Sequence, residues 1–263
     1  MPLKLSVLFL TPLISGLLIF VVANFRAANF KLLLVFAGAY LFGITVVHIL
    51  PELYRENQEV ELIGLFVLIG FFLQQVLEYF SSGIEHGHIH TPHHHHDHQH
   101  HDHHHHDHQH HHHHGHTAVV LLLALCVHAF LEGGMLAEPP HGVNHYDLNA
   151  ILLGIALHRA PAAFALMTVL SAQLHSRLKA LPHLIIFSLA APAGLLLSSF
   201  FVSTDILSGQ GLIFLYALVS GNFLHISTTI VFESSPEHHF NARKLAVAIV
   251  GALAAVAVEY MIG

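Results

Sequence analysis

The chain has 263 residues, of which 54% are apolar and only 10% are charged, and its formal net charge is −7 with histidine neutral. Ordinary soluble domains carry about 25% charged residues, and the mean hydropathy here is +0.62 despite 31 histidines. Because only a bilayer can solvate so much apolar sequence, this composition excludes a soluble globular domain. The acidic balance also argues against nucleic acid as a partner.

Eight apolar segments are long enough to cross a membrane as helices, which takes roughly 20 residues each. Their apolar runs are continuous and do not alternate with polar residues, so helices are favoured over a β-barrel. We therefore predict an all-α membrane protein with eight transmembrane helices. The expected spans are residues 3–24, 31–54, 61–82, 117–137, 147–173, 183–202, 209–232 and 242–262.

One long connection divides the chain into three parts, with spans one to three in residues 1–82 and spans four to eight in residues 117–263. The connection, residues 83–116, contains 21 histidines and has almost nothing to bury, so we expect it to be disordered. Neutral imidazole is a good ligand for zinc, copper and nickel. The loop is therefore predicted to bind metal weakly at many places, or else to be a low-complexity tract without function. The first consecutive ligands that it offers are His93, His94, His95 and His96.

Lysine and arginine predict the orientation, because they accumulate in cytoplasmic loops. Only Lys4 and Arg55 fall on the side that holds both termini, so we expect the termini outside and the His-rich loop in the cytoplasm. The compact chain favours a bacterial inner membrane. The six basic residues on the other side are Arg26, Lys31, Arg177, Lys179, Arg243 and Lys244.

Ionisable residues inside the spans are the candidates for function, because they are costly in a membrane. His128 and Glu132 lie four residues apart on span four, which places them on one helix face, where both can bind one metal ion. Span five adds His158, and the short connection makes the two spans antiparallel neighbours. We predict a mid-membrane metal site at these three residues, with a fourth position filled by water or by His225. A simple hydrogen bond to a neighbouring group is the alternative for His225.

The second span ends in a similar pair, His48 and Glu52, again four residues apart. This pair can form the outer entrance of a metal path, or it can simply lie at the membrane interface.

These features together resemble the ZIP family of divalent-metal transporters. The resemblance rests on eight spans, the His-rich loop after span three, the H-x-x-x-E-G motif that starts at His128 and the H-x-x-P motif that starts at His158. The stretch HRAPAAFAL is most similar to the ZIP subfamily that reads H-K-A-P-A-A-F in its fifth helix. The resemblance implies inverted three-helix repeats, a binuclear site between helices four and five, and zinc or a similar divalent ion carried toward the cytoplasm. It leaves a homodimer open.

The sequence departs from the ZIP motifs at the second metal position. Ala129 stands where the family commonly has an asparagine ligand, and Arg159 and Ala162 replace ligands of the fifth helix. An arginine is always charged and cannot bind a metal ion. Our hypothesis is that Arg159 replaces the second cation and balances Glu132 or another buried acid.

The seventh span ends in FESSPE, which resembles the family's H-E-x-x-P-E motif. The resemblance implicates Glu233, Glu237 and the adjacent His238 in the cytoplasmic exit.

Two other functions fit the same residues. An intramembrane zinc hydrolase would use the His and Glu ligands to hold a catalytic zinc that activates water, but no H-E-x-x-H motif is present and Arg159, not an acid, follows His158. A metal sensor would bind through residues 86–116 and carry nothing. The preferred metal is left open, since His and Glu ligands also accept iron, manganese, cobalt and cadmium.

Overall fold

The structure is a computed structural model that describes residues 1–21, 27–56, 58–81, 118–138, 148–233 and 242–262. Within these ranges the chain forms helices and no strands. Two irregular turns extend α-helices: a 3₁₀ turn, Leu18–Phe20, follows α1, and a π turn, Thr45–Ile49, joins α2 to α3. The α-helices are α1 Pro2–Leu17, α2 Ala27–Ile44, α3 Leu50–Glu56, α4 Val60–Ser81, α5 Ala118–Gly134, α6 Leu148–Gln173, α7 Arg177–Ser203, α8 Gly209–Glu233 and α9 Ala242–Ile262.

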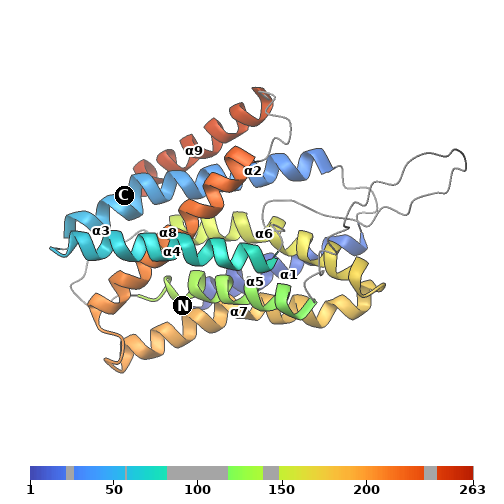
Figure 1. The fold of residues 1–263 in the computed structure, drawn as a ribbon, viewed down its shortest axis with the longest axis horizontal. Coiled ribbons are helices and arrows are strands. Elements are labelled where there is room, and N and C mark those ends of the chain that lie inside the picture. The colour runs from blue at the N-terminus through green and yellow to red at the C-terminus, as the bar shows by residue number, and fades with distance from the viewer. Residues whose placement is uncertain (22–26, 57, 82–117, 139–147, 234–241, 263) are drawn as a thin grey trace, which may run out of the picture.

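The prediction of an all-α membrane protein is confirmed. In the part of the chain that the structure describes, six helices are long and apolar enough to cross a membrane, and a seventh, Val119–Gly134, is apolar but shorter. With α2, its π turn and α3 counted as one rod, the helices match the eight predicted spans one for one. Figure 1 shows most of them running along the long axis of the molecule, with α9 and α8 inclined to it.

The largest difference from the predicted spans is at α7, which begins at Arg177 and not at residue 183. Ser176 is its N-cap, and the Ser176 hydroxyl accepts a hydrogen bond from the backbone N–H of Lys179 at 3.4 Å. The hydropathy pattern missed these first turns because Arg177 and Lys179 lower their hydropathy, whereas the cap depends on one serine.

The helices pack in two groups that share an interface. In one group α1 packs against α6 and α7, and α5 packs against α7; in the other, α2 packs against α8 and α9, and α4 packs against α8. Contacts of α2 with α6 and of α4 with α5 join the groups.

The crossing of α5 and α7 is unusually close because glycine lies on both sides. A Cβ atom added to Gly133 would lie 2.0 Å from the carbonyl oxygen of Ala191, and one added to Gly194 would lie 2.0 Å from that of Phe130. Only residues without a side chain allow two helix backbones to approach in this way. Gly133 directly follows Glu132, so this crossing sets the position of a candidate metal ligand.

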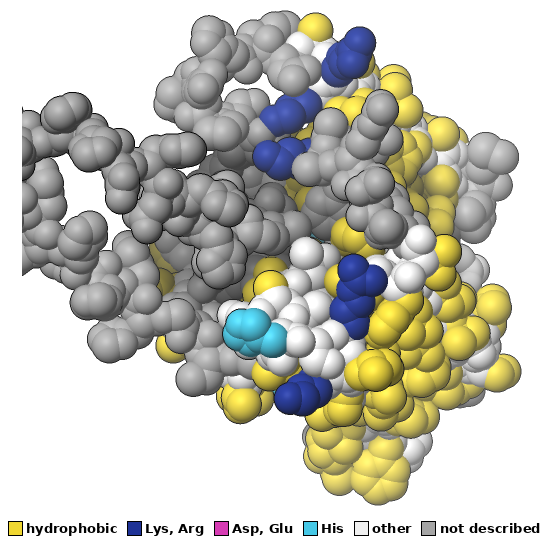
Figure 2. Space-filling view, turned by 90° about the vertical axis from the view of Figure 1, so that its right-hand side faces the viewer, with side chains coloured by type: hydrophobic (Ala, Val, Ile, Leu, Met, Phe, Trp, Pro, Cys, Tyr) yellow, Lys and Arg dark blue, Asp and Glu magenta, His cyan; other side chains and the backbone are white. Residues whose placement is uncertain are grey.

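The ends of the bundle differ in charge. At one end, where α2 and α9 begin, Figure 2 shows lysine and arginine side chains and no acidic side chain among the coloured atoms. The described basic residues at helix ends on this side are Lys31, Arg177, Lys179, Arg243 and Lys244, and the described acids at helix ends on the other side are Glu52, Glu59, Glu61, Glu138 and Asp205.

Candidate metal centre

Three predicted ligands come together inside the bundle. His128 and Glu132 lie one turn apart on α5, and His158 lies on α6. One ligand atom from each side chain can be chosen so that all three lie within 4.8 Å of one another. His128 Nε2 is 3.1 Å from Glu132 Oε1, and the imidazole rings of His128 and His158 are perpendicular, with their centroids 6.0 Å apart.

The geometry and chemistry of this group suit a divalent transition metal. Three atoms at most 4.8 Å apart lie within about 2.8 Å of a common point, and zinc takes nitrogen and oxygen ligands at about 2.0–2.2 Å. Small side-chain movements therefore close the site around an ion. Each of the three residues is 3% exposed or less. Two imidazoles and one carboxylate leave a fourth, open position, as in zinc sites that exchange a ligand.

Hydrogen bonds from two other helices hold α6 beside this group. The hydroxyl of Ser15 on α1 donates to the carbonyl oxygen of Ala160, next to Pro161, and the hydroxyl of Tyr40 on α2 donates to the carbonyl oxygen of Ala150 at 3.3 Å. The backbone of α6 on both sides of His158 is therefore held by contacts from both groups of helices.

Arg159 follows His158 and is 1% exposed. Its Nη2 donates to the carbonyl oxygen of Phe187 on α7 at 3.1 Å, and its guanidinium carbon lies 4.9 Å from the centroid of the Phe187 ring. The positive charge also acts electrostatically on Glu132. A permanent cation thus lies beside the candidate ligands, anchored to α7.

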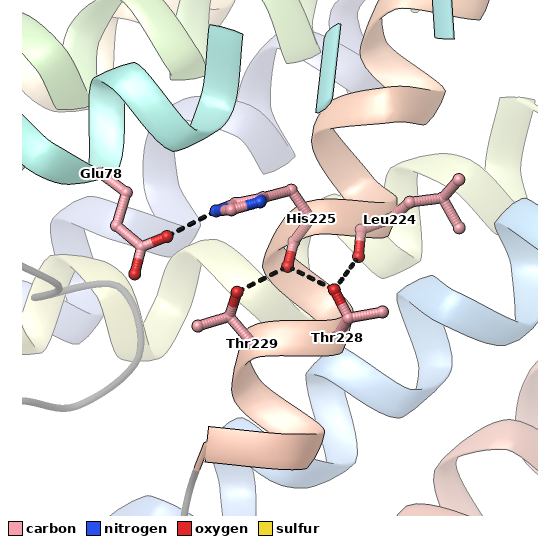
Figure 3. Close-up of polar contacts among 5 residues, drawn as sticks. All are labelled: Glu78, Leu224, His225, Thr228 and Thr229. Atoms are coloured by element: carbon pink, nitrogen blue, oxygen red, sulfur yellow. Dashed lines mark hydrogen bonds and ion pairs between the residues drawn. The ribbon is translucent and has the colours of Figure 1, made fainter. Parts of the chain in front are cut away.

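The structure does not group His225 with the three ligands. Its Nε2 lies 2.6 Å from Glu78 Oε2 on α4, and its ring meets the edge of Phe71 at a centroid distance of 4.8 Å. Figure 3 shows this pair, with Thr228 and Thr229 donating to the His225 carbonyl oxygen. The sequence reasoning missed Glu78, although an acid inside the third apolar span was itself a signal.

The remaining predicted residues lie apart from the centre or are not described. His48 lies in the π turn of the second span and is 8% exposed, whereas Glu52 is half-buried in α3. Glu233 ends α8, and its side chain is not described. The other predicted metal-binding positions lie outside the described residues: Glu237, His238, His93, His94, His95 and His96.

The described residues thus form a helical membrane bundle with a buried group of two histidines and one carboxylate that could hold a metal ion. The sequence profile of the family described as ZIP Zinc transporter matches residues 3–259. The chain therefore belongs to the ZIP zinc transporter family, and it is a multi-pass membrane transporter for zinc or related divalent metals, not an enzyme. No curated protein matched the sequence.

Proposed function

We propose that this chain moves zinc or a similar divalent ion toward the cytoplasm through one mid-membrane site formed by His128, Glu132 and His158. The observation that carries the proposal is the convergence of these three buried side chains from α5 and α6, two helices that both pack against α7. A water molecule takes the fourth position. Such a site selects by ligand type yet releases its ion, because three ligands hold a metal less firmly than a closed four-ligand cage.

Arg159 limits this site to a single ion. With neutral imidazoles, Glu132 and Arg159 together carry no net charge in the empty site, so the buried carboxylate is balanced when no metal is present. A second divalent cation would have to bind beside a guanidinium that α7 holds in place. The mutual repulsion opposes this binding and also favours release of the one ion that does bind.

The uneven charge of the two ends supports an orientation of the chain in the membrane, and transport toward the cytoplasm is the direction that the family resemblance implies. The end with the described lysines and arginines faces the cytoplasm, since basic residues are retained there. The ion enters from the acidic end, past His48 and Glu52, and leaves toward Glu233, Glu237 and His238, where the His-rich loop can take it up. In this arrangement both termini are outside. The proposed membrane is a bacterial inner membrane, and the proposed partners include a second copy of the chain in a homodimer.

Zinc titration calorimetry on purified protein lacking residues 86–116 tests the single site, because the deletion removes the loop's own histidines. We expect one zinc ion per chain, and none after the additional changes His128→Ala and His158→Ala. A matched control, His183→Ala on α7, changes a histidine outside the site and keeps the stoichiometry at one. Two ions per chain in the loop-deleted protein, or one ion retained after both substitutions, would contradict the proposal.

A further inference from the structure

A basic cluster marks the point where α2 and α9 begin at the positively charged end. Lys31 lies in the first turns of α2, and Arg243 and Lys244 are the second and third residues of α9. The two helices pack against each other and begin at the same end of the bundle, so their basic residues gather there. Basic side chains gathered at the ends of two packed helices create a positive potential that attracts an anion.

An apolar groove lies deeper on the same helices. It has a volume of about 210 Å³ and is enclosed by α2, α8 and α9. Two lining side chains, Phe42 and Ile249, are 38% and 50% exposed, so the groove reaches the outer surface of the bundle, which faces lipid. Its lining residues are Ala39, Phe42, Ser227, Thr228, Val231, Ala248, Ile249 and Ala252.

The groove and the cluster are aligned along both helices. With a rise of 1.5 Å per residue, Ala248 and Ala252 lie about 6 and 12 Å from Lys244 along α9, and Ala39 lies about 12 Å from Lys31 along α2. A charged group at the membrane surface and an apolar recess beneath it are the two halves of a phospholipid site. Basic residues between transmembrane helices on the cytoplasmic side commonly bind anionic lipid headgroups.

The walls of the groove are packed tightly enough to hold its shape. A Cβ atom on Gly251 would lie 2.5 Å from the Phe36 carbonyl oxygen, and one on Gly38 would lie 2.9 Å from the Ile230 side chain. These contacts fix α9 and α8 against α2 on either side of the recess, so the site is formed before a lipid arrives.

We propose that the cytoplasmic ends of α2 and α9 bind an anionic phospholipid, with its phosphate at Lys31, Arg243 and Lys244 and one acyl chain in the groove between α2, α8 and α9. All the residues involved belong to helices that do not carry the metal ligands. The site would therefore make the packing of this group of helices depend on the lipid composition of the membrane.

Native mass spectrometry of the detergent-solubilised full chain tests this, with phosphatidylglycerol and phosphatidylcholine of identical acyl chains as probes. We expect tighter binding of phosphatidylglycerol. The double change Lys31→Gln and Lys244→Gln should weaken that binding by roughly fivefold per removed charge, the value of one cation near an anionic headgroup. The matched control, Arg177→Gln with Lys179→Gln, removes the same charge at the same end of the bundle and should leave the preference intact.

A second pair of variants tests the groove without changing any charge. Ala248→Phe fills the recess and should weaken phosphatidylglycerol binding, whereas Leu253→Phe, at a 60% exposed position of α9 outside the groove, should not. Thermal unfolding in detergent verifies that each variant is folded. The proposal would be overturned if the wild type bound the two lipids equally, or if the two double variants lost the same amount of phosphatidylglycerol binding. Unchanged binding in Ala248→Phe would also overturn it. A wild-type dimer that becomes a monomer in Ala248→Phe would likewise overturn the proposal, because a second copy of the chain, and not a lipid, would then cover the groove.

Discussion

The close crossing of α5 and α7 gives a sharp prediction about the metal centre. In the variant Gly133→Ala the new methyl group would lie 2.0 Å from the carbonyl oxygen of Ala191, where ordinary contact begins at 3.4 Å. The two helices must separate by about 1.4 Å or rotate, because the obstacle is backbone and cannot change rotamer. Such overpacking costs roughly 1–3 kcal/mol.

The displacement acts directly on metal binding. Glu132 precedes Gly133 on α5, so a shift on the order of 1 Å moves its carboxylate relative to His158, whereas metal sites tolerate only about 0.2 Å in ligand distance. We therefore expect Gly133→Ala to lower the melting temperature by several degrees and to weaken zinc binding at least tenfold. Thermal unfolding and zinc titration in detergent measure the two effects.

The control is Gly64→Ala on α4, where the nearest atom to an added Cβ is the Tyr54 hydroxyl oxygen at 3.7 Å. This variant should match the wild type in both assays. If Gly133→Ala binds zinc and melts like Gly64→Ala, the close crossing does not position Glu132 and the reasoning fails.

Three further predictions concern charge. Arg159→Ala should lower the melting temperature, because it removes the hydrogen bond to the Phe187 carbonyl oxygen and the positive charge nearest in sequence to the candidate ligands, and should slow transport; normal melting and normal uptake would refute the balancing role. Glu138→Gln should cost no more than about 1 kcal/mol at neutral pH, because Glu138 pairs with Lys4 at 3.1 Å but is 68% exposed. The hydrogen bond and charge of Lys4 lower the pKa of Glu138 below its ordinary value of 4.5. The pair's contribution is therefore present above pH 4.5 and is lost as the pH falls through the lower folded pKa. Melting curves of wild type and Glu138→Gln should converge at that acidic pH, and a difference that grows there would contradict the assignment.

Much of the fold could be predicted because each span needs only composition and length to be recognised. The proximity of two candidate ligands could be predicted in the same way, since a spacing of four residues places His128 and Glu132 on one helix face whatever the rest of the chain does. The inference about His128 and Glu132 rests on local geometry. The proximity of His158 to them also depends on tertiary packing, because α5 and α6 barely touch each other and both pack against α7.

The features that the sequence did not reveal depend on pairs of distant residues. Glu78 and His225 are 147 positions apart, and their contact follows from the packing of α4 on α8. The contact between Arg159 and the Phe187 carbonyl likewise requires α7 to lie beside α6. The hydropathy pattern predicts how many helices there are but not which helices pack together. It therefore could not show that His225 pairs with Glu78.

Uptake of radioactive zinc into proteoliposomes tests the central claim, transport through the site at His128, Glu132 and His158. The comparison is between wild type, the double variant His128→Ala with His158→Ala, the control His183→Ala and a deletion of residues 86–116. We predict uptake by wild type, by His183→Ala and by the loop deletion, and background uptake by the double variant. Undiminished uptake by a correctly folded double variant would show that the ion takes another path.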